Sequence, residues 1–143
     1  KTLLEKNQEK DKVSAKHIHN SKQVFLSLIK VRMSSPLFRL TTAQAIIDRV
    51  SFLNMGKNQQ LGLIAMLIDD TNNAERIDEN ISQIVVLFNS SMERKLLSFA
   101  HANTFVLHPA LAHGNDPIVK QSRIEEQGFS VPALTTSVFI RKR

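Results

Sequence analysis

Two aliphatic runs constrain the fold of this chain more than any other feature of its sequence. Residues 61–68 read LGLIAMLI and residues 84–88 read IVVLF, and polar turn residues follow each run. Short apolar runs bounded by turn signals predict strands. A strand with one face in water alternates apolar and polar side chains, and neither run does so. We therefore expect these strands to be covered on both faces.

One cover is expected to be a facing sheet. The other is either the chain's own N-terminal helix or a part of the protein that lies outside this chain. The simpler alternative is a pair of central strands that leave a few aliphatic side chains exposed.

A long helix is predicted before the strands. Over residues 13–34, apolar side chains such as Ile18, Phe25 and Ile29 recur at helical spacing. Pro36 is expected to end the helix, because the residue before a proline is displaced from the α region. Residues 1–12 are mostly charged or amide-bearing and are expected to form a mobile lead-in.

The remainder of the chain, residues 36–143, shows short strand signals separated by turns. After a short helical turn at 41–45, further strands are predicted at 49–54, 95–99, 104–108, 123–126, 129–131 and 136–141. Strands of this length and spacing are typical of a sandwich. The predicted fold class is therefore mainly β: an antiparallel β-sandwich preceded by one long N-terminal α-helix.

The composition limits the classes of partner and site. The formal net charge is +6, but the basic residues are scattered, and their densest cluster is Arg141-Lys142-Arg143. There is no Trp or Tyr to stack on bases. A solvated basic surface without a nucleic-acid partner is the preferred interpretation. The absence of cysteine excludes disulfides, zinc–thiolate sites and thiol nucleophiles.

No targeting or membrane segment is apparent. No apolar run approaches the ~20 residues that cross a bilayer, and the polar start at Lys1 lacks the features of a signal peptide. Because the first residue is Lys1 rather than Met, we expect a processed or excised segment.

The histidines do not form a catalytic or metal-binding pattern. They are His17, His19, His101, His108 and His113. No pair has zinc-protease spacing, and none lies beside a serine or cysteine nucleophile motif. Structural or solvated roles are expected for all five.

Two acidic pairs, Asp69-Asp70 and Glu125-Glu126, also fail as sites. A glycosidase holds two carboxylates about 5–10 Å apart, whereas neighbours on a strand point to opposite faces. Asp69-Asp70 is typical of a strand-ending turn. The same pair does not begin an EF-hand calcium loop, because the positions that require Gly and Glu hold other residues. We therefore predict no catalytic, cofactor-binding or metal-binding residue, and no cofactor.

Six segments are informative when they are considered together and in order. They are 28–40 (LIKVRMSSPLFRL), 49–56 (RVSFLNMG), 62–70 (GLIAMLIDD), 84–89 (IVVLFN), 106–109 (VLHP) and 131–139 (VPALTTSVF). This series resembles the C-terminal part of pullulanase-type α-1,6-glucosidases, which are glycoside hydrolases of the α-amylase superfamily. The resemblance extends from about residue 13 to residue 140.

The resemblance implies a division of the chain. Residues 13–35 would be the last helix of a catalytic (β/α)₈ barrel that lies upstream, and residues 36–143 would be the C-terminal β-sandwich. The sandwich would support the barrel without catalysing, while the parent enzyme hydrolyses α-1,6 bonds of starch and related α-glucans outside the cell or in the periplasm. The family's catalytic carboxylates belong to the barrel, and no residue here matches them.

The resemblance also implies what covers the apolar strands, because the family's sandwich packs on its barrel. Without the barrel, the face formed by Phe25, Leu28 and Ile29 would be exposed. We therefore expect the helix to fold back or the chain to self-associate.

Two other functions stay open. A carbohydrate-binding module is less favoured, because such modules usually present exposed aromatic rings and this chain's aromatic residues are all phenylalanine. A basic nucleic-acid-binding module is favoured less still.

Overall fold

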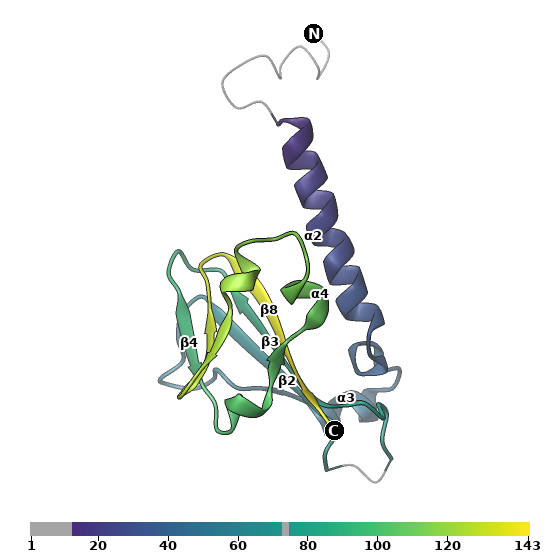
Figure 1. Ribbon diagram of the computed structural model, residues 1–143. Helices are drawn as coiled ribbons and strands as arrows, with labels where there is room; N and C mark the ends of the chain where they lie inside the picture. The colour runs from purple at the N-terminus through teal and green to yellow at the C-terminus, as the bar shows by residue number, and fades with distance from the viewer. Residues whose placement is uncertain (1–12, 73–74) are drawn as a thin grey trace.

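The structure is a computed structural model that describes residues 13–72 and 75–143. The predicted mobile lead-in, residues 1–12, lies outside the described residues. Figure 1 shows a long helix, α2 (Ala15–Met33), that leads into two layers of strands and extends beyond them at its N-terminal end. The predicted fold class, an antiparallel β-sandwich preceded by one long helix, is confirmed.

Local interactions set both ends of α2. The Ser14 hydroxyl accepts a hydrogen bond from the His17 N–H (3.3 Å), and Nδ1 of His17 accepts one from the Ser14 N–H (3.4 Å). This reciprocal pair is a capping box, with histidine in the place of the usual Glu or Gln. At the other end, Ser35 is extended (φ −145°, ψ 140°) before Pro36, as predicted from the restriction that proline imposes.

The remaining elements follow the predicted order with shifted limits. They are η1 (Pro36–Arg39), α3 (Ala43–Arg49), β1 (Val50–Phe52), β2 (Leu63–Asp69), β3 (Ile81–Asn89), β4 (Lys95–Ser98), η2 (Ala102–Thr104), β5 (Val106–Leu107), α4 (Pro109–Ala112), η3 (Val119–Gln121), β6 (Arg123–Glu125), β7 (Gly128–Val131) and β8 (Thr135–Lys142). All the predicted strands are present.

Two of the predicted limits are wrong. Thr42 caps α3 by accepting from the Ala45 N–H (3.1 Å), and the helix then continues through Arg49, which was predicted to begin a strand. Thr104 lies in η2 rather than in a strand. In both places a short helical turn replaces the first residues of the predicted strand.

The strands form two antiparallel sheets. One has the order β1-β2-β3-β8-β5 and the other the order β4-β7-β6. The inner faces enclose a core centred on Phe129, whose ring lies 4.7 Å from that of Phe139 and 5.3 Å from that of Phe105, measured between centroids. Val85 and Leu87 of β3 are fully buried against this core.

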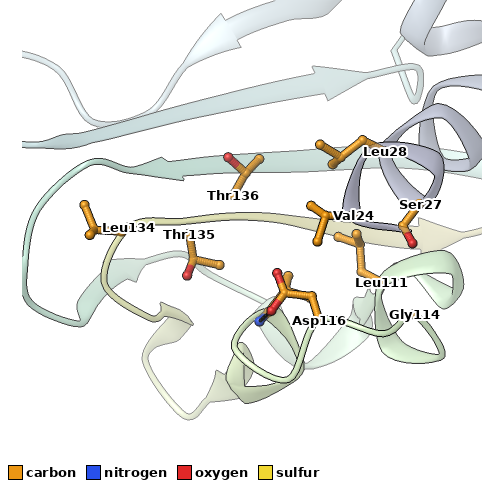
Figure 2. A pocket seen from close by; sticks show the side chains of 10 residues that line it. Val24, Ser27, Leu28, Leu111, Gly114, Asp116, Leu134, Thr135 and Thr136 are labelled. Atoms are coloured by element: carbon orange, nitrogen blue, oxygen red, sulfur yellow. Dashed lines mark hydrogen bonds between the residues drawn. The ribbon is translucent and has the colours of Figure 1, made fainter. Parts of the chain in front are cut away.

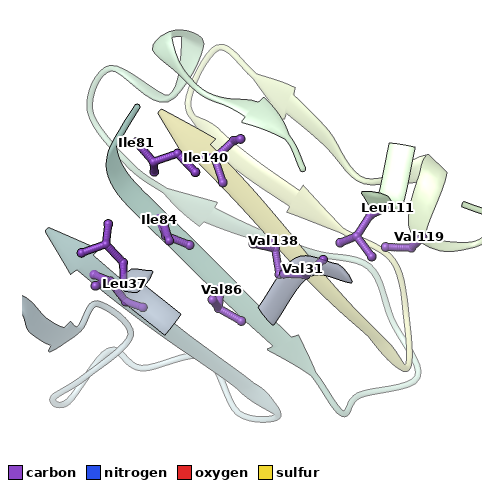
Figure 3. Packing of buried hydrophobic residues seen from close by; sticks show 10 residues of the cluster. Val31, Leu37, Ile81, Ile84, Val86, Leu111, Val119, Val138 and Ile140 are labelled. Atoms are coloured by element: carbon purple, nitrogen blue, oxygen red, sulfur yellow. The ribbon is translucent and has the colours of Figure 1, made fainter. Parts of the chain in front are cut away.

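The outer face of the five-stranded sheet carries a second apolar cluster (Figure 3). Its buried members on the sheet are Ile68, Ile81, Ile84, Val86, Val138 and Ile140, and its buried cover consists of Val31, Leu37, Leu111 and Val119. The expected second cover therefore exists in part. The helix α2 supplies only Val31 of it, because Val31 is its one buried residue.

Two consequences correct the expectations from the sequence. The rest of the cover comes from η1, α4 and η3, which the sequence patterns did not predict. Phe25 of α2 is 62% exposed, so the helix does not fold back to bury its apolar face, and that expectation is wrong. Self-association stays a prediction.

Among the described residues, no helix is both long enough and apolar enough to cross a membrane.

Candidate docking face and the network behind it

The described residues contain no group of three or more His, Cys, Asp or Glu side chains placed to hold a metal ion. The five histidines are dispersed. His17 caps α2, His19, His101 and His113 are exposed, and His108 is buried beside α4. The structure brings none of them together, and the prediction that the chain has no catalytic residue stays a prediction.

The feature that stands out is an exposed apolar stripe on α2. Ile18, Phe25 and Ile29 recur at helical spacing, so they lie along one side of the helix. They are 62%, 62% and 41% exposed. The opposite side, with Val24 and Val31, faces the sandwich. A helix that is apolar on two sides normally has a partner on each.

A second exposed apolar group lies on the sheet. Ile64 of β2 pairs with Phe88 of β3, and Phe52 of β1 pairs with Met66, two residues beyond Ile64. Because side chains alternate along a strand, Phe52, Ile64 and Phe88 lie on one face of the sheet. Ile84 and Val86 of β3 share that face with Phe88, so the three exposed residues continue the outer apolar cluster beyond its cover.

The two groups are adjacent. Leu28 of α2 and Thr136 of β8 line the same pocket (Figure 2). Thr136 is the cross-strand partner of Phe88. Leu28 therefore links α2 to the uncovered part of the sheet, and we call the stripe and the exposed sheet group together the open face: Ile18, Phe25, Ile29, Phe52, Ile64 and Phe88. Exposed apolar side chains gathered on neighbouring elements mark interaction surfaces.

Two consecutive serines attach α2 to the sandwich. Ser34 Oγ lies 2.8 Å from Nε2 of His108, at the start of α4. Ser35 Oγ donates to the Asp78 carboxylate (2.5 Å), and the other oxygen of that carboxylate accepts from the Ile81 N–H at the start of β3 (3.0 Å). These bonds fix the direction in which the helix leaves the sandwich.

The hydrogen bonds also assign the protonation of His108. The Ala110 N–H donates to Nδ1 (3.1 Å), so Nδ1 carries no hydrogen and the proton is on Nε2. Nε2 then donates to Ser34 Oγ, which itself donates to the Val31 carbonyl (2.7 Å). Burial lowers the pKa of His108 from 6.5, because the imidazolium would lose its hydration.

This arrangement predicts a loss of stability on acidification. Since the folded-state pKa of His108 lies below the unfolded value, the unfolded chain binds more protons than the folded chain below pH 6.5. The free energy of unfolding therefore decreases as the pH is lowered, by at most about 1.4 kcal/mol per pH unit from this group. His108→Asn keeps a cap for α4 but does not titrate. We expect its free energy of unfolding, from urea titrations, to decrease less between pH 7 and pH 5.5 than that of the unaltered chain. The exposed His19→Asn is the matched control, and an unchanged slope for His108→Asn would contradict the assignment.

A buried ionic cluster links α3, the residue after β2 and the C-terminal residue. Asp70 accepts from Nε of Arg49 and from Nη2 of Arg143, each at 2.8 Å, and from the Ile77 and Asp78 N–H groups at 3.0 and 3.3 Å. Its side chain is fully buried. Burial alone would raise the pKa of Asp70, but the hydrogen bonds from Arg49, Ile77 and Asp78 outweigh it and lower the pKa below 3.8.

The sequence patterns did not predict this cluster. Asp69 does form the predicted strand-ending turn by accepting from the Thr71 N–H (2.8 Å), but its neighbour Asp70 points inward. The C-terminal basic residues are not simply a solvated cluster, because Arg143 pairs with Asp70 and Arg141 donates to Gln83 (3.2 Å). Glu125 and Glu126 are exposed at the end of β6. No local pattern marked the cluster, because Asp70 belongs to the polar run 69–72 and its partners lie 21 and 73 positions away in the sequence.

Fold and face together define a class: an antiparallel β-sandwich domain that is joined to a long helix and bears an uncovered apolar surface. A family model described as "Alpha-1,6-glucosidases, pullulanase-type, C-terminal" matches residues 1–142. The chain therefore belongs to this family of pullulanase C-terminal domains, and the resemblance seen in the sequence is confirmed.

Individual relatives agree. Pullulanase 1 of Arabidopsis thaliana, a chloroplastic protein, is 38% identical over 144 residues, which cover 92% of this chain and 14% of that protein. A pullulanase of Klebsiella pneumoniae is 37% identical over 75 residues, 52% of this chain and 7% of that protein. The chain thus spans only a small part of the relatives it matches.

Solved structures give the same result. Apo pullulanase from Klebsiella pneumoniae superimposes with a TM-score of 0.82 at 28% identity, over 90% of this chain and 14% of that one. PulA from Klebsiella oxytoca gives a TM-score of 0.82 at 27% identity, over 89% of this chain and 12% of that one. The fold described above is therefore the fold of a domain within those larger chains.

Proposed function

We propose that this chain is the non-catalytic C-terminal β-sandwich of a debranching glycoside hydrolase, and that its open face packs on the catalytic (β/α)₈ barrel of the same polypeptide. The observation that carries the proposal is the open face itself. A soluble domain rarely leaves a contiguous set of aromatic and aliphatic side chains in water unless a partner covers them.

The energetic argument favours a permanent partner. Complete burial of a fully exposed Phe or Ile side chain contributes about 1.5–3 kcal/mol. The six side chains of the open face are 40–62% exposed, so covering each of them gains roughly half of that. A partner in the same polypeptide does not incur the full loss of translational and rotational freedom that separate partners incur. A tethered barrel therefore gains more from covering this face than a free protein would.

The activity proposed for the parent is hydrolysis of α-1,6-glucosidic bonds in starch and related α-glucans. Family membership supports it, and the catalytic carboxylates would be supplied by the barrel. An extracellular or periplasmic location, which the resemblance implied, stays a prediction, and the relatives also include a chloroplastic protein. In this arrangement residues 13–35 would be the last helix of the barrel.

Glucan binding by the sandwich itself is the second candidate. One observation favours it: Phe52 and Phe88 are both exposed on one face of the sheet. Two features count against a stacking platform, because Ile64 is exposed on the same face and the chain has no Trp or Tyr. Specific retention of the chain on immobilised amylopectin or pullulan, lost in a Phe52→Ala variant, would favour this candidate over docking.

Phe25→Glu tests the docking proposal. In the polypeptide extended by its barrel, we expect the change to lower the free energy of unfolding by about 2 kcal/mol, because a buried ring is lost and a charge is desolvated. In the 143-residue chain, where Phe25 is 62% exposed, the effect should stay within about 0.5 kcal/mol. Urea unfolding followed by circular dichroism measures both.

Met92→Glu is the matched control for this experiment. Met92 is 79% exposed on the connection from β3 to β4 and is not part of the open face. It should have a small effect in both forms of the protein. Equal effects of Phe25→Glu in the long and the short form would reject the docking proposal.

A further inference from the structure

A pocket of about 200 Å³ opens between α2 and the beginning of β8 (Figure 2). Val24 and Leu28 of α2 form one wall and Leu111 of α4 contributes to the floor. Thr135 and Thr136 of β8 lie opposite the helix. Both Leu28 and Thr136 border the open face, so the pocket is a recess of that face.

The lining defines the chemistry of an occupant. Val24, Leu28, Leu111 and Val119 make the interior apolar, whereas the polar groups are hydroxyls and the Asp116 carboxylate. One oxygen of that carboxylate, Oδ1, accepts from the Ile118 N–H (2.8 Å) and caps the turn before η3. Apolar cavities of about 150 Å³ in proteins accept a benzene ring. The pocket therefore suits an aromatic ring or a branched aliphatic side chain better than a sugar.

Leu134, at the mouth of the pocket, provides an independent observation. Its φ is +50°, in the left-handed region that favours glycine or asparagine over a leucine. Its side chain is also 65% exposed. Within this chain, a leucine at this position combines backbone strain with an apolar side chain in water. Such outliers point to a contact that the chain alone does not make.

We propose that the pocket is a socket for one aromatic or branched aliphatic side chain of the preceding catalytic barrel, and that Leu134 packs against this side chain at the mouth. The inference rests on the proposed function, and it adds a defined contact point to the general docking face. Three observations favour the barrel as the source of the occupant: the pocket is continuous with the open face, α2 forms its wall, and most of the length of the relatives lies outside the region that this chain matches.

Single-cysteine labelling tests the socket directly, because the chain has no cysteine of its own. The variants are Leu134→Cys in the socket, Phe25→Cys on the open face and Met92→Cys as the control. Each is reacted with iodoacetamide in the 143-residue chain and in the polypeptide extended by the barrel, and the modified residue is located by peptide mass spectrometry. Truncating an exposed side chain to cysteine should leave all three variants folded.

We expect all three cysteines to react rapidly in the 143-residue chain. In the long form, labelling of Leu134→Cys and Phe25→Cys should slow by about tenfold or more, because modification then requires opening of the interface, while Met92→Cys stays fast. Rapid labelling of Leu134→Cys with slow labelling of Phe25→Cys would overturn the socket and leave the docking proposal intact. Rapid labelling of both would overturn both.

A second copy of the chain is the remaining occupant to distinguish. Slow labelling of Leu134→Cys in the 143-residue chain at high concentration, relieved by dilution, would identify self-association at the pocket. That outcome would also overturn the barrel side chain as the occupant.

Discussion

Gly128→Ala is expected to unfold the sandwich or to destabilise it by at least about 4 kcal/mol, the range of severe single substitutions. Gly128 has φ +152° and lies in β7 opposite Ser98 of β4. A Cβ at this position would lie 1.9 Å from the Leu97 carbonyl oxygen and 2.9 Å from the Phe99 nitrogen. Both obstacles are backbone atoms, so neither can turn away as a side chain could.

The expected damage is large because of what the strand carries. The next residue, Phe129, is fully buried and contacts the rings of Phe105 and Phe139 in the core between the sheets. Moving β7 away from β4 would therefore open the main core as well as the small sheet. Near-ultraviolet circular dichroism and urea unfolding would measure the loss of packing and of stability.

Gly56→Ala is the matched control. Gly56 also has a positive φ, +91°, but nothing lies within 4 Å of the position that a Cβ would take. Its replacement should cost only the backbone strain, about 1–2 kcal/mol. If Gly128→Ala proved no more harmful than Gly56→Ala, the close approach of β4 and β7 would be wrong.

The strands and the long helix were predictable because their signals are local. The aliphatic runs that became β2 and β3 lie between turn residues, and Pro36 stands just after α2. The register follows from pattern too, since alternate residues of β3 belong to the two different clusters. Each of these features is set by neighbours within one element.

The cover of the outer sheet face was not predictable in the same way. The helix α4 has only four residues, Pro109–Ala112, and is too short to show a helical period. Its cap is the side chain of His108, which was expected only to be structural or solvated. Leu111 and Val119 then reach the core as single apolar residues, without any run that marks them.

The open face was predicted in outline for a physical reason. The absence of alternation in β2 and β3 indicated that more apolar surface would be present than one sheet can cover. The structure locates the surplus at Ile64 and Phe88, beyond the reach of Val31 and Leu37. Which residues remain exposed depends on where the short covering segments end, and no local pattern encodes that position.

Asp70→Asn is expected to destabilise the chain by about 3–5 kcal/mol, the loss typical when one partner of a buried ion pair is removed. Asparagine is nearly isosteric with aspartate, so the change leaves no cavity. It leaves the guanidinium groups of Arg49 and Arg143 without their buried counter-charge, although Arg49 still donates to the Glu75 carbonyl (2.7 Å). The cluster joins residues that are 21 and 73 positions from Asp70, which is why the sequence showed only a turn.

The pH dependence distinguishes this electrostatic role from a packing role. Because the folded-state pKa of Asp70 lies below its ordinary value of 3.8, the folded chain binds fewer protons, and the stability from this group is present above that value and is lost as the pH falls through the lowered pKa. Asp70→Asn lacks a titrating group, so its free energy of unfolding should differ most from that of the unaltered chain near pH 7 and least in strong acid. Asp48 is exposed and its carboxylate accepts from the Gln44 side chain (2.7 Å). Asp48→Asn therefore removes the same charge at the surface and should change stability by less than about 0.5 kcal/mol. A deficit of Asp70→Asn that stayed constant between pH 7 and pH 3 would show that packing, and not the paired charge, makes Asp70 necessary.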